Sequence, residues 1–270
     1  MAAGRFEASL DASGKLGHDP APAFLAMSPI AEADGTGADT MPLTLRSAIL
    51  SLALALAPSG ASAQSPVDVD LQLVLAVDSS GSVDFGEFEL QTLGIAGAFR
   101  DAEVIEAIVH WAPKGVAVSV VHWSGRGQQL VAVDWTRVGD RTSAEALAAS
   151  LEAIRRSMLA ETALGEGLRF AINHLARGPY RGARQIIDVS GDGRSNVGAP
   201  PAPFRDVAIA AGITINGLAI LNDDLTVDLY YADQVIGGPD AFVVTAHDFD
   251  DFARAMRLKL LREIRGTPLG

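Results

Sequence analysis

The sequence contains no cysteine. This absence excludes a disulfide framework and a zinc site built from thiolates. The sequence also lacks a Gly-x-x-x-x-Gly-Lys phosphate loop, a His-Glu-x-x-His zinc pair and a complete dinucleotide-binding fingerprint, which argues against the enzyme classes that depend on them. Basic side chains are scarce, since 21 Lys and Arg stand against 33 Asp and Glu, for a net charge of −12. Such an acidic chain is unsuited to nucleic acid or an anionic membrane as its main partner.

A long apolar run is missing as well. The run at residues 48–57 has half of the roughly 20 residues that a membrane-spanning helix needs, so no stable membrane span is predicted. It follows a short basic start at residues 41–46 and precedes the Ala-x-Ala sequence Ala61-Ser62-Ala63. Residues 41–63 are therefore predicted to be a signal peptide that directs the protein to the periplasm or out of the cell. Residues 1–40 show no sustained period and are interpreted as a disordered extension or a misassigned start.

Strand-like and helix-like segments alternate through residues 64–270, which we expect to form one domain. The alternation predicts an α/β fold of three layers, doubly wound, with helices on both faces of a mostly parallel central sheet. The turn Ser124-Gly125-Arg126-Gly127 predicts one antiparallel hairpin at the sheet edge. Strands are expected at 68–77, 116–123, 130–135, 185–189, 213–220 and 242–245, and helices at 85–100, 143–155, 163–176, 204–211 and 249–264.

A polar cluster directly follows the first apolar strand. It reads Asp78-Ser79-Ser80-Gly81-Ser82, so one carboxylate and two hydroxyls stand at alternate positions. Side chains at this spacing can turn towards a common point, which suits a hard divalent cation that prefers oxygen ligands. The same residues are common in ordinary turns, and the motif alone does not decide between the two interpretations.

Two later segments strengthen the metal interpretation. A second apolar strand runs into Ser190-Gly191-Asp192, and a polar loop containing Thr162 opens a predicted helix. In an open α/β sheet, loops beyond the carboxyl ends of the strands converge on one crevice. There, Asp78 and Asp192 would repel each other if both were ionised, and a divalent cation would remove that cost.

With these residues, the sequence resembles the von Willebrand factor type A (vWA) family and its metal-ion-dependent adhesion site. The resemblance implies that the hydroxyls of Ser80, Ser82 and Thr162 bind the metal directly, while Asp78 and Asp192 act through water. Mg²⁺ is the expected ion, with Mn²⁺ or Ca²⁺ as alternatives. Segments that look closest to secreted bacterial vWA-like proteins of unknown function lie at 187–193, 212–220 and 235–239.

Two positions depart from the family pattern. Many vWA domains have Thr/Ser-Asp-Gly after the central strand, whereas here Gly191 separates Ser190 from Asp192. Many also have a small residue before the threonine, where this chain has Glu161. An exposed Glu is the ordinary case, so we predict that Glu161 faces water rather than the metal.

The function predicted from these features is an exported, metal-dependent protein-binding module of the adhesion type. It would use the cation to capture an Asp or Glu of a protein partner, and it would not be an enzyme. Two alternatives remain open at this stage: a hydrolase or phosphotransferase that uses the same ion, and a scaffold that binds no metal. A phosphotransferase with Asp78 as nucleophile would need a further acidic ligand where Ser80 stands. The pair Tyr230-Tyr231 is interpreted as part of the fold rather than of a site.

Overall fold

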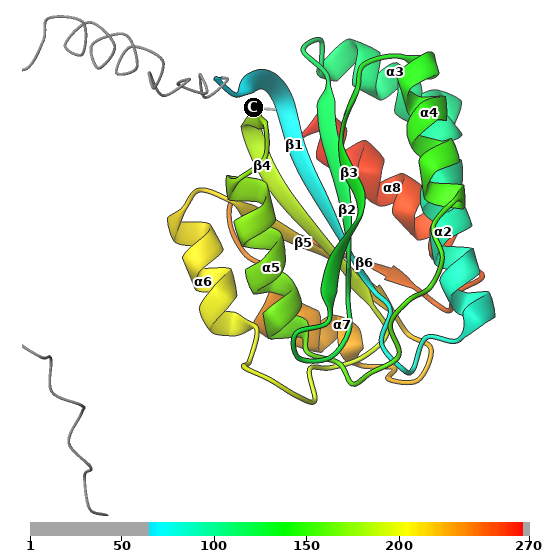
Figure 1. The fold of residues 1–270 in the computed structure, drawn as a ribbon, viewed down its shortest axis with the longest axis vertical. Helices are drawn as coiled ribbons and strands as arrows, with labels where there is room; N and C mark the ends of the chain where they lie inside the picture. Colours follow the sequence, from blue (N-terminus) through cyan, green and yellow to red (C-terminus); the bar gives the residue numbers. More distant parts are fainter. Residues whose placement is uncertain (1–64, 267–270) are drawn as a thin grey trace, which may run out of the picture. The chain divides into compact units, whose positions relative to one another are not determined.

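The computed structural model describes residues 65–266, which form a six-stranded sheet with helices on both faces (Figure 1). The strand order is β3-β2-β1-β4-β5-β6, and every neighbouring pair is parallel except the antiparallel pair β2 and β3 at one edge. The predicted α/β class and its edge hairpin are therefore confirmed. The strands are β1 (Val67–Asp78), β2 (Val116–Trp123), β3 (Gln129–Val138), β4 (Tyr180–Gly191), β5 (Thr214–Ile220) and β6 (Val243–Ala246).

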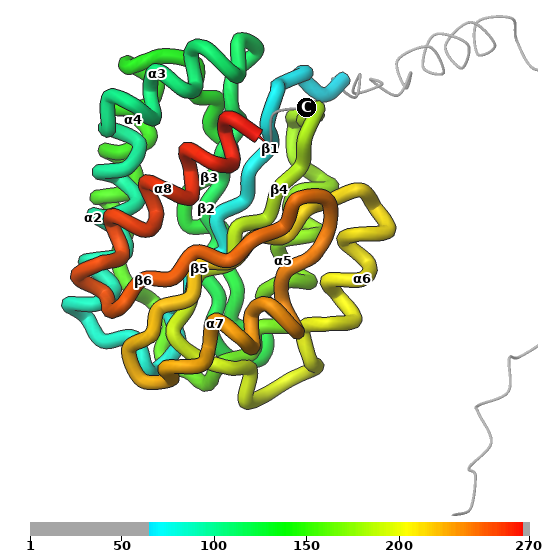
Figure 2. The backbone as a smooth tube through the Cα atoms, turned by 180° about the vertical axis from the view of Figure 1, so that it is seen from behind, coloured from blue at the N-terminus to red at the C-terminus, as the bar shows by residue number. Residues whose placement is uncertain are grey.

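Two helical layers enclose the sheet, as both views of the backbone show (Figures 1 and 2). One layer contains α2 (Phe85–Arg100), α3 (Ala102–Trp111), α4 (Arg141–Glu152) and α8 (Phe252–Arg265). The other contains α5 (Leu164–Ala176), α6 (Ala202–Ala210), α7 (Val227–Tyr230) and a following π-helical turn, η1 (Tyr231–Val235). None of the described helices is long and apolar enough to span a membrane. The predicted signal peptide and residues 1–40 lie outside the described part of the chain.

Both cores depend on the alternation of side chains along the central strand. In β1, Leu73 and Leu75 belong to the core shared with α2 and α8, while Val74 and Ala76 belong to the core shared with α5 and η1. Successive residues of a strand point to opposite faces, so a strand buried on both faces is apolar at nearly every position. This is why β1 reads as a continuous apolar run that ends at Asp78.

Three helical elements, α3, α7 and η1, were not predicted from the sequence. Helix α3 begins directly after α2 because Asp101 ends one helix and caps the next, accepting hydrogen bonds from the backbone N–H groups of Glu103 (2.9 Å) and Val104 (3.2 Å). The turn η1 follows α7 without a break and carries the buried side chain of Tyr231. The ten residues of α3 do show a helical spacing, since Val104, Ile105 and Ile108 are buried together, whereas α7 and η1, with four and five residues, are too short to show one.

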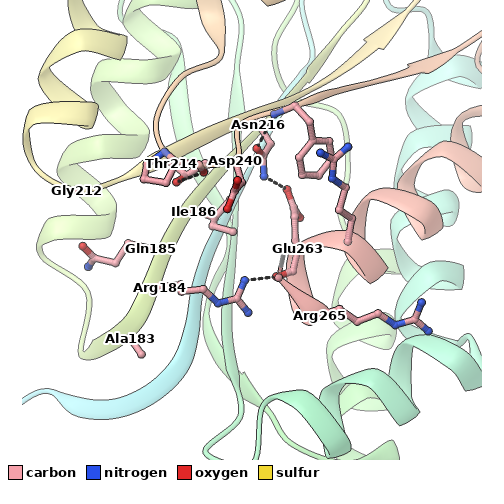
Figure 3. A pocket seen from close by; sticks show the side chains of 14 residues that line it. Ala183, Arg184, Gln185, Ile186, Gly212, Thr214, Asn216, Asp240, Glu263 and Arg265 are labelled. Atoms are coloured by element: carbon pink, nitrogen blue, oxygen red, sulfur yellow. Dashed lines mark hydrogen bonds between the residues drawn. The ribbon is translucent and has the colours of Figure 1, made fainter. Parts of the chain in front are cut away.

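Buried charged groups join α8 to the sheet. The Lys259 ammonium lies 2.9 Å from Asp188 Oδ2 on β4 and 2.5 Å from Glu263 Oε1, and all three side chains are at most 1% exposed. Asn216 on β5 donates to Glu263 Oε1 at 2.9 Å, beside a hollow of about 380 Å³ (Figure 3). Arg184 donates to the backbone oxygen of Ile264, in the last turn of α8, at 2.8 Å. These polar contacts hold α8 against β4 and β5.

Candidate metal site

The predicted site lies at the carboxyl edge of the sheet, where β1 and β4 end side by side. Val77 pairs with Ser190 across these two strands, so Asp78 and Asp192 leave the sheet next to each other. Thr162 comes from the segment that leads into α5, on the other side of the same edge. The structure therefore brings the three loops together as the α/β topology requires.

Direct contacts connect all five predicted residues. The backbone N–H of Ser80 donates to Asp78 Oδ1 at 2.7 Å, and the Ser80 and Ser82 hydroxyls lie 3.2 Å apart. The Ser82 hydroxyl donates to Asp192 Oδ1 at 3.0 Å, and the Thr162 hydroxyl donates to Ser80 Oγ at 3.4 Å. Residues as far apart in sequence as Ser82 and Asp192 thus share one cluster of oxygen atoms.

The cluster is buried on its inner side and open on its outer side. Asp78 and Ser80 are fully buried and Asp192 is 1% exposed, whereas Ser82 is exposed. Burial, followed by the charge of Asp192, raises the pKa of Asp78 to about 7. Burial also raises the pKa of Asp192, although the hydrogen bond from Ser82 opposes this. Two carboxyl groups with raised pKa values in one cluster favour a positive charge or a proton between them.

The donor set agrees with a hard divalent cation. Asp78 Oδ2 and Asp192 Oδ2 are buried and accept no hydrogen bond within residues 65–266, so each has coordination capacity left. Carboxylate and hydroxyl oxygens suit Mg²⁺, Mn²⁺ and Ca²⁺ better than soft metals. The described residues contain no group of three or more His, Cys, Asp or Glu side chains that could hold a metal. A cation here would therefore depend on the three hydroxyls as well as the two carboxylates.

Residues outside the motif tie the loops together. Thr162 and Asn196 bond reciprocally, since the Thr162 N–H donates to Asn196 Oδ1 and the Asn196 N–H donates to the Thr162 carbonyl, both at 2.9 Å. The Arg156 guanidinium donates to the Ser80 carbonyl at 2.8 Å, and the Gly81 N–H donates to the Ala160 carbonyl at 2.7 Å. Sequence reasoning assigned no role to Asn196 or Arg156. Only the polar, Gly-rich composition around Asn196 gave any signal.

The two departures from the family pattern have different structural outcomes. Glu161 is exposed, and its place outside the metal shell stays a prediction. Gly191 is the last residue of β4, and a Cβ atom there would lie 2.7 Å from Tyr231 Oη and 2.9 Å from Asp78 Oδ2. Glycine is therefore required by space at this position. Tyr231 packs in the core, in agreement with its interpretation as part of the fold, and the sequence did not indicate that its hydroxyl lies beside Gly191.

The outer side of the cluster opens into a shallow depression. It is lined by Gly81, Ser82, Leu159, Ala160, Glu161, Thr162 and Asn196. Two of the predicted ligands, Ser82 and Thr162, therefore border a surface that another molecule can approach. Leu159 is an exposed part of this lining, and Arg156 lies over the ring of the exposed Phe85 at 5.4 Å.

Comparison with solved structures identifies the class of fold. Proximal thread matrix protein 1 from the mussel byssus matches with 17% identity over 74% of this chain and 49% of its own, at a TM-score of 0.56. A structure of that protein with a zinc-occupied MIDAS motif matches with 15% identity over the same shares, at 0.52. The pilus adhesin SpaC from Lactobacillus rhamnosus GG matches with 15% identity over 74% of this chain and 31% of its own, at 0.53. This chain thus spans about half or less of the length of these proteins.

The strand order and these matches give the domain the fold of von Willebrand factor type A domains, which confirms the resemblance seen in the sequence. Within that class, a family model described as a protein of unknown function (DUF1194) matches residues 68–268, and the chain belongs to this family. No curated protein matches the sequence.

Proposed function

We propose that this protein is an exported module that captures an acidic group of a protein partner through a divalent cation. The residues that would hold the cation are Asp78, Ser80, Ser82, Thr162 and Asp192, with Mg²⁺ as the expected ion and Mn²⁺ or Ca²⁺ as alternatives. A cation bound there supplies an electrophilic position for a carboxylate oxygen. The chain's own residues orient the hydroxyls, bury Asp78 and Ser80 on the inner side and leave Ser82 exposed on the outer side.

The observation that carries this proposal is the pair of buried carboxylate oxygens without a hydrogen-bond partner, Asp78 Oδ2 and Asp192 Oδ2, in a cluster with three hydroxyls. Buried polar atoms are normally satisfied, so two such atoms in one polar cluster indicate a missing positive partner. The three hydroxyls add oxygen atoms but no charge, which leaves a bound ion able to attract an acidic group.

Two further points support binding to a protein rather than catalysis. The outer depression is shallow and lies at the protein surface, where a side chain of another molecule can reach Ser82 and Thr162. The matched pilus adhesin and byssal matrix protein share the fold with this chain. Export is proposed from the signal-peptide pattern at residues 41–63, and the absence of cysteine is compatible with it.

The test is a calorimetric titration of the metal-stripped full chain with Mg²⁺, Mn²⁺ and Ca²⁺. We expect one saturable ion in the wild type and no binding in Asp78→Ala/Asp192→Ala. Ser80→Ala should weaken binding strongly, whereas Ser79→Ala should not, because the Ser79 hydroxyl lies 3.3 Å from the carbonyl of Trp123 and takes no part in the cluster. Equal effects of the two serine variants would contradict the assigned ligands.

A second measurement separates binding from the alternatives. We expect the metal-loaded protein to retain an Asp-rich or Glu-rich peptide, and to release it when EDTA is added, without turnover of the peptide or of a phosphate ester. Turnover that requires Asp78 would favour the hydrolase or phosphotransferase. Partner binding that survives Asp78→Ala/Asp192→Ala would favour a scaffold that uses no metal.

A further inference from the structure

One buried hydroxyl, that of Tyr231, lies beside the proposed cation site without being one of its ligands. Tyr231 begins η1, its side chain is fully buried, and its hydroxyl has no hydrogen-bond partner in the described part of the chain. Leaving a buried hydroxyl unpaired costs stability, and phenylalanine would fill the same ring space without that cost. Ring packing explains why an aromatic residue stands here, but it does not explain the hydroxyl.

The neighbour of this hydroxyl is also unpaired. Tyr231 Oη and Asp78 Oδ2 lie 2.7 and 2.9 Å from the same point, the position that a Cβ atom of Gly191 would occupy. The other oxygen of that carboxylate, Oδ1, already accepts from the Ser80 N–H at 2.7 Å. A phenol is protonated at neutral pH and can donate, whereas an ionised carboxylate can only accept. The two orphaned atoms are therefore complementary.

Two glycines make this approach possible. A Cβ atom at Gly217 on β5 would lie 2.8 Å from Tyr231 Cδ1, so the ring fits here only because glycine has no side chain. In the same way, the absence of a side chain at Gly191 on β4 leaves room for the Tyr231 hydroxyl. Adjacent strands thus leave open a path that leads the phenol ring to the Asp78 carboxylate. This also gives a reason for the Ser-Gly-Asp sequence in place of the more common family pattern.

We propose that Tyr231 is a positioning residue of the cation site, whose hydroxyl donates a hydrogen bond to Asp78 Oδ2 directly or through one water. The inference rests on the proposed cation site. With the Ser80 N–H on one oxygen and the Tyr231 hydroxyl on the other, the carboxylate is held from both sides and its ionised form is favoured in a buried place. Tyr231 itself does not touch the ion; groups that orient ligands in this way typically contribute 10–100-fold to metal affinity.

The test compares Mg²⁺ titrations of the full-length wild type, Tyr231→Phe and the control Tyr180→Phe. Tyr180 is the first residue of β4, at the opposite end of the strand from Gly191. We expect Tyr231→Phe to lower Mg²⁺ affinity at least about tenfold and Tyr180→Phe to leave it unchanged. A hydroxyl with only a structural role predicts equal Mg²⁺ affinity in all three proteins, and that result would overturn the inference. If the wild type itself binds no Mg²⁺, Mn²⁺ or Ca²⁺, both the proposed function and the inference about Tyr231 fail.

A spectroscopic measurement gives an independent answer should Tyr231→Phe not fold. The chain has three tyrosines. Addition of Mg²⁺ should produce a tyrosine difference absorption that follows binding and that persists in both Tyr180→Phe and Tyr230→Phe, which leaves Tyr231 as its source. A signal that disappears in Tyr230→Phe, or no tyrosine signal while Mg²⁺ binds, would overturn the inference and leave the proposed cation site intact.

Discussion

Removing the charge of Asp78 should stabilise the metal-free protein at alkaline pH while abolishing cation binding. In Asp78→Asn, the amide oxygen can still accept the hydrogen bond that Ser80 N–H donates to Oδ1 at 2.7 Å. The substitution therefore keeps the shape and the loop contact and removes the buried negative charge. Cation sites often conflict with stability in this way when the ion is absent, because their ligands are arranged for a charge that is not there.

The magnitude follows from the pKa of the Asp78 carboxyl group. Burial and the charge of Asp192 raise this pKa from its ordinary 3.8 to about 7. Between these values the folded protein holds a proton that the unfolded chain has lost, so the free energy of unfolding falls as the pH rises through this window. The loss is complete above about pH 7 and amounts to at most about 4 kcal/mol. Below about pH 4, both states are protonated and the loss disappears.

The assay is urea unfolding of the full chain in EDTA at about pH 4 and about pH 8. The difference between Asp78→Asn and wild type is the quantity to compare, since other buried carboxyl groups such as Asp188 titrate in both proteins. We expect this difference to grow by several kcal/mol in favour of the variant at the higher pH. Asp68→Asn, an exposed position on the same strand, should follow the wild type. A difference that is the same at both pH values would refute the electrostatic reasoning.

Lys259→Met should lower the free energy of unfolding by about 3–5 kcal/mol, because it leaves the buried carboxylates of Asp188 and Glu263 without the Lys259 ammonium. Urea unfolding measures this loss, with the exposed Lys114→Met as the control. Gly191→Ala should lower both the stability and the Mg²⁺ affinity, measured by thermal unfolding and calorimetry. Gly193→Ala should change neither quantity, because a Cβ atom there meets nothing within 4 Å. Mass spectrometry of the exported protein should find an N-terminus near Gln64, and an exported species that retains residues 1–40 would contradict the predicted signal peptide.

The sequence alone determined the fold class, because this class depends on local patterns of apolar and polar residues. The strand that ends at Asp78 is apolar on both faces and is followed by a polar turn, and helical segments separate it from the next apolar strands. Such alternation indicates parallel strands with crossover helices whatever the detailed packing. Since loops after the strands meet at one edge, it also predicted that Thr162 and Asp192 would join the motif.

Only the tertiary structure decided what surrounds these residues. The Ser82 hydroxyl meets Asp192 from 110 positions away, Tyr231 Oη and Asp78 Oδ2 both border the space left by Gly191, and Lys259 forms ion pairs with carboxylates on two elements. Periodicity reports which face of a strand is buried, but it contains no information on which distant side chain is packed there. That choice depends on how two helical layers close over the sheet, and it is made by contacts between segments that share no local pattern.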